Sequence, residues 1–171
     1  MKKRMMAMML IMVMMFALVP TTAQAASVPC KVTKALNKCV DDNGRCIVID
    51  QSGQKMYLYK RNCTTRKWEL KKSFRCICGD RLDPGKHYLL LRNDDTDLRT
   101  YRKGSKTYQY GVYIDCYEEA PTKAMRIHSY PEIKGKVYKD SAHNTCGFSI
   151  CLDNAAYVWK YYGDGTAVMG C

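Results

Sequence analysis

Several features that would place this sequence in a familiar class of protein are missing. Beyond residue 25 there is no second long apolar run, so we expect no membrane span in the rest of the chain. There is no internal repeat and no low-complexity tract, which excludes a repeat array and a long biased linker. No helix-turn-helix, RNA-binding or zinc-finger pattern is present, and no nucleic-acid partner is predicted. Histidine is scarce, with three residues, which narrows the choice of a general base.

The first 25 residues have the pattern of a secretory signal peptide. A basic start (residues 2–4) is followed by an apolar run (residues 5–19) and the small-residue ending Ala23-Gln24-Ala25. The alternative is a membrane anchor, but the apolar run is shorter than the ~20 residues that span a bilayer. We therefore predict a leader over residues 1–25, cleavage after Ala25 and a secreted protein.

The remaining 146 residues are enough for one domain with a sizeable core. Residues 26–45 are polar, contain two cysteines and end at the turn signal Asp42-Asn43-Gly44, which indicates an N-terminal extension. Residues 46–171 form the predicted domain. Loss of the three basic leader residues lowers the formal net charge from +12 to +9. This charge favours an anionic partner, although a solvated basic face is its simpler explanation.

All ten cysteines lie after the leader, at positions 30, 39, 46, 63, 76, 78, 116, 146, 151 and 171. An even number in an exported protein predicts a disulfide framework, whose pairing the sequence does not reveal. Cys76 and Cys78 form a close pair, but no second close pair at zinc-finger spacing follows, so we expect no metal and no cofactor. The two share one strand face, where a bond between them would be strained, and we expect each to pair elsewhere.

The local pattern predicts a mainly β domain, a sandwich, barrel or mixed sheet, with one late helix and disulfide stabilisation. A hairpin is expected at 46–60, around the turn Gln51-Ser52-Gly53-Gln54. Further strands are expected at 68–79, 87–91, 107–115, 124–128 and 166–170. The helix is expected to start at Asp153, whose carboxylate would cap its first turn, and to end before Gly163.

Five segments in this order resemble the L,D-transpeptidases, the YkuD-like family. They are IVIDQSGQKMYLYK, SFRCICG, DPGKHYLL, MRIHSYP and GDGTAV, and the resemblance covers residues 46–170. It implies the fold of that family and acyl transfer on peptidoglycan stem peptides, with cell-wall cross-linking or remodelling as the outcome. It also implies a location at or near the cell wall, where an anionic wall polymer would suit the basic charge. We expect a monomer.

The signature Ser-His-Gly-Cys followed by Ile/Val-Arg is not intact, and three alignments place the nucleophile differently. Cys146 lies 18 residues after His128 and 19 before Gly165, close to the family's spacing, and is the preferred nucleophile. Alignment on Leu-Asp-Asn-Ala-Ala instead places Ser149 at that position. Cys151 keeps a good distance from His128 but shortens the following helix by about one turn.

The acyl-transfer chemistry implied by the resemblance needs a base beside the thiol, because a free thiol with a pKa of about 8.5 is mostly protonated at neutral pH. His128 matches the family's histidine at the end of a strand and is the predicted general base, then acid. His143, three residues before Cys146, is the reserve base. Backbone amides around Cys146 and Gly147 are the expected oxyanion donors.

Two other readings stay open. In the first, the chain keeps the fold, has lost the catalytic motif, and binds wall or protein. In the second, it is a small basic effector held together by disulfides. The even cysteine count bears on this choice, because a free Cys146 would leave nine other cysteines, one of them without a partner.

Overall fold

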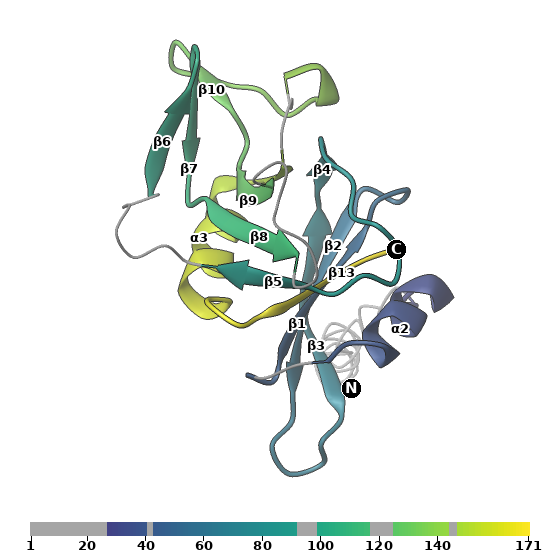
Figure 1. The fold of residues 1–171 in the computed structure, drawn as a ribbon. Helices are drawn as coiled ribbons and strands as arrows, with labels where there is room; N and C mark the ends of the chain where they lie inside the picture. The colour runs from purple at the N-terminus through teal and green to yellow at the C-terminus, as the bar shows by residue number, and fades with distance from the viewer. Residues whose placement is uncertain (1–26, 41–42, 92–98, 117–124, 144–146) are drawn as a thin grey trace, which may run out of the picture.

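The structure is a computed structural model that describes residues 27–40, 43–91, 99–116, 125–143 and 147–171 (Figure 1). The predicted leader, residues 1–25, lies outside the described residues, and so does the predicted nucleophile Cys146.

A nine-stranded mixed sheet forms the centre of the domain, in the order β3-β2-β1-β13-β5-β8-β9-β12-β4. Two neighbouring pairs, β1 with β13 and β9 with β12, are parallel, and the other pairs are antiparallel. This confirms the predicted mainly β fold with a mixed sheet. The strands are β1 (Arg45–Asp50), β2 (Lys55–Arg61), β3 (Trp68–Arg75), β4 (Ile77–Cys78), β5 (Tyr88–Leu91), β8 (Val112–Cys116), β9 (Met125–Ser129), β12 (Phe148–Ile150) and β13 (Ala167–Gly170).

The predicted hairpin is formed by β1 and β2, with Asp50 paired to Lys55 across the turn. The Asp50 carboxylate closes this turn by accepting a hydrogen bond from the amide of Gly53 at 2.6 Å. An aspartate that bonds the backbone a few residues ahead is a common stabiliser of turns. Gln54 completes the turn in the left-handed region, at φ 49°.

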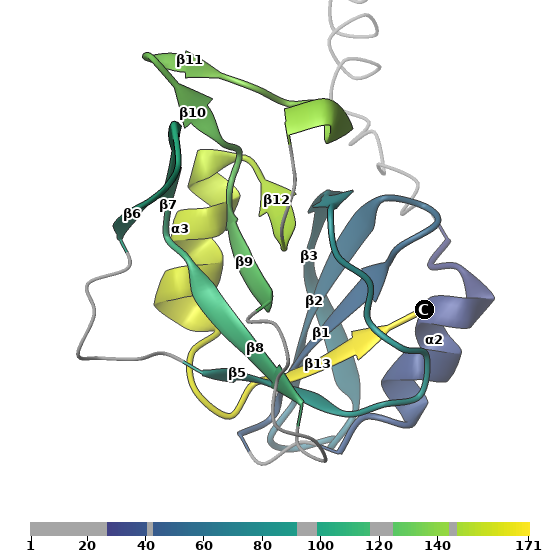
Figure 2. The ribbon, with the colours of Figure 1, turned by 45° about the horizontal axis from the view of Figure 1, so that its top comes forward.

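A second, four-stranded sheet stands above one end of the large sheet (Figure 2). Its order is β11 (Lys136–Val137), β10 (Glu132–Ile133), β7 (Lys106–Gln109) and β6 (Thr100–Lys103). The sequence predicted a single strand over 107–115, and this was wrong. The chain leaves β7 at Tyr110, which has φ 53°, and starts β8 at Val112 in the other sheet.

The late helix α3 (Leu152–Tyr161) confirms the predicted helix to within a residue at its start. Its cap differs from the prediction: Cys151 is the N-cap residue, and Asp153 lies inside the first turn without capping it through a side-chain hydrogen bond. A carboxylate there still favours the helix, because it faces the positive end of the helix dipole. α3 packs beside β9, the strand that carries His128.

An early helix, α2 (Cys30–Asn37), lies within the predicted extension and was missed. Its buried residues Val32, Ala35 and Leu36 have the i, i+3, i+4 spacing of one helix face, so the signal was present in a short, polar segment. The side chain of Lys31 fixes the helix to the sheet through an ion pair with Asp50 at 2.5 Å.

The two helices cover opposite sides of the sheet around β1 and β13 (Figures 1 and 2). Successive residues of a strand point to opposite faces, and β1 and β2 alternate accordingly between two buried clusters. The larger cluster includes Ile47, Ile49, Met56, Leu58, Ile114, Ile127, Phe148 and Val158. The smaller cluster lies under α2 and includes Val32, Leu36, Val48, Tyr57, Tyr59 and Met169.

The expected disulfide framework stays a prediction. Among the described cysteine side chains, which exclude those of Cys116 and Cys146, no two sulfurs lie at bonding distance. None of the helices in the described part of the chain is long and apolar enough to cross a membrane.

Candidate active site

His128 lies near the end of β9 and is fully buried. Its strand runs parallel to β12, and the register places Ser149 directly opposite it. The Ser149 hydroxyl oxygen lies 3.3 Å from Nδ1 of the imidazole, and Ser149 is also fully buried. The structure therefore brings together the predicted base and one of the three candidate nucleophiles.

The hydrogen bonds of His128 determine which ring nitrogen can act as a base. Nδ1 lies 2.7 Å from the backbone carbonyl oxygen of Ser129. A carbonyl oxygen only accepts hydrogen bonds, so Nδ1 carries the proton and donates it. In the neutral imidazole Nε2 is then the unprotonated nitrogen. Ser149 faces the protonated nitrogen, which makes it a poor partner for proton abstraction.

Nε2 faces the turn that contains Gly147. A Cβ atom added to Gly147 would lie 2.9 Å from Nε2 and 2.3 Å from the carbonyl oxygen of Arg126. Gly147 has φ 66°, in the left-handed region that favours glycine. The backbone can approach the imidazole this closely because the residue has no side chain, and the unprotonated nitrogen thus lies close to the backbone of Gly147.

The amide of Gly147, an expected oxyanion donor, has a partner in this structure. It donates a hydrogen bond of 2.5 Å to the carboxylate of Asp80. In return the carbonyl oxygen of Gly147 accepts hydrogen bonds from the amides of Gly79 and Asp80, at 2.8 and 3.2 Å. The segment after β4 therefore holds the turn in place, and the Asp80 carboxylate is the hydrogen-bond acceptor of the Gly147 amide.

Aromatic rings cover His128 from the second sheet. The ring of Tyr108 in β7 meets the imidazole edge-on, with centroids 4.6 Å apart, and Tyr101 in β6 stacks on Tyr108 at 5.0 Å. The guanidinium of Arg126 lies 4.7 Å from the ring centre of Tyr101. These contacts explain why His128 is shielded from solvent.

His143, the reserve base, lies in the 3-10 helix η1 (Ser141–His143) and is held by its own partners. Its Nδ1 donates to the Asp140 carboxylate at 2.8 Å, and Tyr138 stacks on the ring at 4.0 Å. The hydrogen bond from His143 lowers the pKa of Asp140. In the neutral ring Nε2 is again the basic nitrogen, and the imidazole is partly exposed.

The sequence predictions of site residues are not decided by these contacts. Cys146 lies outside the described residues, and Cys151 is partly exposed at the start of α3. Asp80 and Tyr108 were missed, because a carboxylate on a loop and a tyrosine in a strand carry no signal until the fold brings Asp80 to Gly147 and Tyr108 to His128. Within the described ranges, no three His, Cys, Asp or Glu side chains meet in an arrangement that holds a metal ion.

Comparison with known proteins places this geometry in a wider context. No protein-family model matches the sequence, and no curated protein matches it. Solved structures do resemble it. A fused zinc-dependent amidase/peptidase/peptidoglycan-binding domain-containing protein from Clostridium acetobutylicum has a TM-score of 0.55 at 14% identity, covering 81% of this chain and 57% of its own.

Two similar structures are L,D-transpeptidases. The one from Stackebrandtia nassauensis has a TM-score of 0.51 at 10% identity, with 82% of this chain and 62% of its own covered. The one from Mycobacterium smegmatis has a TM-score of 0.50 at 10% identity, with coverage of 75% and 58%. The chain has an L,D-transpeptidase-like fold.

Identities this low establish the fold alone, and the chain spans 57% to 62% of the length of these three proteins. The L,D-transpeptidase-like fold nevertheless confirms the architecture implied by the ordered segments of residues 46–170. His128 lies on the strand beside the late helix, as those segments implied. The catalytic roles of individual residues stay predictions.

Proposed function

We propose that this protein is a secreted L,D-transpeptidase that acts on peptidoglycan stem peptides by cysteine acyl transfer. Cys146 is the nucleophile in this proposal, and His128 is the general base and then the acid. One observation carries it: the unprotonated Nε2 of His128 lies close to Gly147, the residue that directly follows Cys146 in the chain. The L,D-transpeptidase-like fold supports the choice of substrate.

In the proposed reaction Nε2 takes the proton of the Cys146 thiol, and the thiolate attacks the carbonyl carbon of a peptide bond before a D-residue. The C–N bond breaks, and the leaving amine takes the proton from His128. A thioester remains. The amine of a second stem then loses a proton to His128 and attacks the thioester, which forms a new peptide bond and restores the thiol.

Negative charge develops on the carbonyl oxygen during each attack and needs hydrogen-bond donors. The amide of Gly147 is the proposed donor, and the Asp80 carboxylate now accepts its hydrogen bond. A substrate carbonyl oxygen would replace the carboxylate oxygen there. The N–H group keeps an acceptor in this exchange, because both oxygens accept hydrogen bonds.

The second candidate is a module of the same fold that binds stem peptides without catalysis. The full burial of His128 and Ser149 favours it, since a working base must meet its substrate. The hydrogen bond between the Gly147 amide and Asp80 also favours it, because this amide already has an acceptor and is not open to a substrate oxygen.

The two candidates are distinguished by incubating the exported, mature protein with a tetrapeptide stem. Release of D-alanine and an adduct on the intact protein would be measured by mass spectrometry. Cys146, Ser149 and Cys151 lie in one tryptic peptide, residues 140–160, so the adduct must be localised by fragmentation. N-terminal sequencing of the same sample tests cleavage after Ala25.

Cys146→Ser is expected to abolish the adduct and D-alanine release, and His128→Gln to lower the rate by about 100-fold or more. Ser149→Ala, Cys151→Ser and the matched control Cys63→Ser are expected to retain activity. Stem binding without an adduct would establish the binding module instead. Neither binding nor an adduct would overturn both candidates.

A further inference from the structure

A second pair of reactive groups, Cys76 and Cys78, lies just before and at the end of β4, which β12 separates from β9, the strand of His128. Cys76 lies between β3, which ends at Arg75, and β4, which begins at Ile77, and Gln54 holds both cysteines through their backbone amides. The carbonyl oxygen of Gln54 accepts the Cys76 amide at 2.8 Å, and its side-chain Oε1 accepts the Cys78 amide at 3.0 Å. Gln54 is fixed in turn by a 2.8 Å bond from its Nε2 to the carbonyl oxygen of Gln51.

Cys76 and Cys78 are close enough for their thiols to interact, and neither forms a disulfide in the structure, so their expected pairing with other cysteines stays a prediction. Their environments differ. Cys76 is fully buried, whereas Cys78 is partly exposed. The hydrogen bond from Cys76 lowers the pKa of Cys78, and the same bond, together with burial, raises the pKa of Cys76. Cys78 is therefore the more nucleophilic sulfur and Cys76 the protected one.

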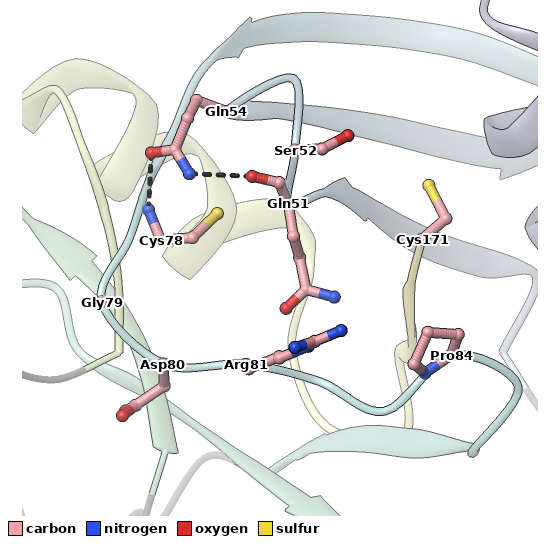
Figure 3. Close-up of a pocket in the computed structure, with 9 residues that line it drawn as sticks. All are labelled: Gln51, Ser52, Gln54, Cys78, Gly79, Asp80, Arg81, Pro84 and Cys171. Carbon is pink, nitrogen blue, oxygen red and sulfur yellow. Dashed lines mark hydrogen bonds between the residues drawn. The ribbon is translucent and has the colours of Figure 1, made fainter.

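Cys78 lines a surface cavity of about 650 Å³ (Figure 3). The cavity wall also includes Gln51, Gln54 and the side chain of Arg81, and Figure 3 shows Arg81 and Cys78 on the same loop around it. The volume is in the range of small-molecule sites. A guanidinium at the wall favours a ligand that carries a carboxylate.

We propose that Cys76 and Cys78 form a thiol–disulfide exchange site for small disulfides that carry a carboxylate. In the first step the Cys78 thiolate attacks one sulfur of the disulfide. A bond forms between that sulfur and Cys78, the disulfide bond of the ligand breaks, and the departing thiolate takes up a proton.

In the second step Cys76 attacks the sulfur of Cys78. The Cys76–Cys78 bond forms, the mixed disulfide breaks, and the second thiol of the ligand leaves with a proton. Two protein thiols are oxidised and one ligand disulfide is reduced to two thiols. In the mixed disulfide Cys78 has no thiolate, so its interaction with Cys76 no longer raises the pKa of Cys76.

The ring that a Cys76–Cys78 disulfide closes is strained, and this strain suits exchange rather than a permanent crosslink. Residues i and i+2 of an extended chain lie about 6.6 Å apart, near the upper limit for bridged Cα atoms. Strained disulfides are easily reduced and pass their oxidation on to other thiols. The site is independent of the proposed acyl transfer, because neither step uses Cys146 or His128.

The test uses the reduced mature protein and glutathione disulfide. Trypsin cleaves after Arg75 and Arg81 and releases the peptide CICGDR, which contains both cysteines and no other. Mass spectrometry then distinguishes the dithiol, the mixed disulfide and the internal disulfide. The wild-type protein is expected to yield the internal disulfide, and Cys76→Ser a persistent mixed disulfide at Cys78.

Cys63 is the internal control, because it is more exposed than Cys78. Exposure alone predicts that Cys63 reacts faster, whereas the proposal predicts that Cys78 reacts at least about tenfold faster. Cys63→Ser is expected to leave the products of CICGDR unchanged. A slower Cys78, or a Cys76→Ser product identical to that of the wild type, would overturn the exchange site.

Arg81→Gln tests the class of ligand. It is expected to slow the reaction with glutathione disulfide severalfold and to leave the reaction with cystamine, a disulfide without carboxylates, unslowed. Equal slowing with both disulfides would refute the role of the carboxylate. A Cys146→Ser variant should react as the wild type does, so failure of the acyl-transfer proposal would not affect this result.

Discussion

Replacing Gly147 by alanine tests whether the backbone packs against His128 as the structure shows. Two costs add. A residue with a Cβ atom in the left-handed region costs about 1–2 kcal/mol, and Gly147 has φ 66°. The new Cβ would also lie 2.3 Å from the carbonyl oxygen of Arg126 and 2.9 Å from Nε2 of His128. Overpacking of this kind costs about 1–3 kcal/mol. We therefore expect Gly147→Ala to lower the free energy of unfolding by roughly 2–5 kcal/mol.

Two other glycines separate these costs. Gly135 has φ 78° but open space around its added Cβ, so Gly135→Ala measures the backbone cost alone. Gly163 has open space and no left-handed φ, so Gly163→Ala is expected to be nearly neutral. Urea unfolding followed by tryptophan fluorescence gives all three values. If Gly147→Ala cost no more than Gly135→Ala, the close approach of the turn to the imidazole would be refuted.

Three further predictions concern stability. Phe148→Ala removes a fully buried side chain and is expected to lower the free energy of unfolding by about 3–5 kcal/mol. Leu152→Ala, at an exposed position, should change it by less than about 1 kcal/mol. Equal losses in urea unfolding would contradict the packing of β12. Val32→Ala is expected to cost about 1.5–3 kcal/mol by the same assay, because α2 seals the smaller cluster through this fully buried residue; no loss would mean that the helix does not pack there. Burial raises the pKa of Asp50, but hydrogen bonds from Lys31, Gly53 and Ser52 outweigh it and lower the pKa below the ordinary 3.8. The stabilisation that ionised Asp50 contributes is therefore complete above its pKa in the unfolded chain, and it is lost as the pH falls through its pKa in the folded protein. Between neutral and acid pH, the wild type should lose more free energy of unfolding than Asp50→Asn. Parallel pH profiles of the two proteins would count against the ion pair.

The sequence predicted the position of His128 at the end of a strand, but it did not predict the residues that surround it in the fold. A histidine at the end of a strand, followed at a set distance by a cysteine, is a pattern along one stretch of chain. The carbonyl oxygen of Ser129 determines which ring nitrogen of His128 is basic. The acceptor of the Gly147 amide is Asp80, which lies 67 residues earlier in the chain. The sequence predicted one strand over 68–79, whereas β3 ends at Arg75 and β4 begins at Ile77, because Gln54, more than 20 residues earlier, accepts hydrogen bonds from the amides of Cys76 and Cys78.

Sequence patterns alone predict the elements whose apolar period is local, namely the β1–β2 hairpin, the strands around it, and helix α3. Alternation along a strand and the turn residues of a hairpin act between neighbouring residues, so they can be read without the fold. The tertiary structure decided the split of 107–115 between two sheets, the burial of His128 under Tyr108, and the contact of Asp80 with Gly147. Each of these joins residues that are far apart in the chain, and the free energy that favours them comes from burial and hydrogen bonds that exist once the sheets have assembled.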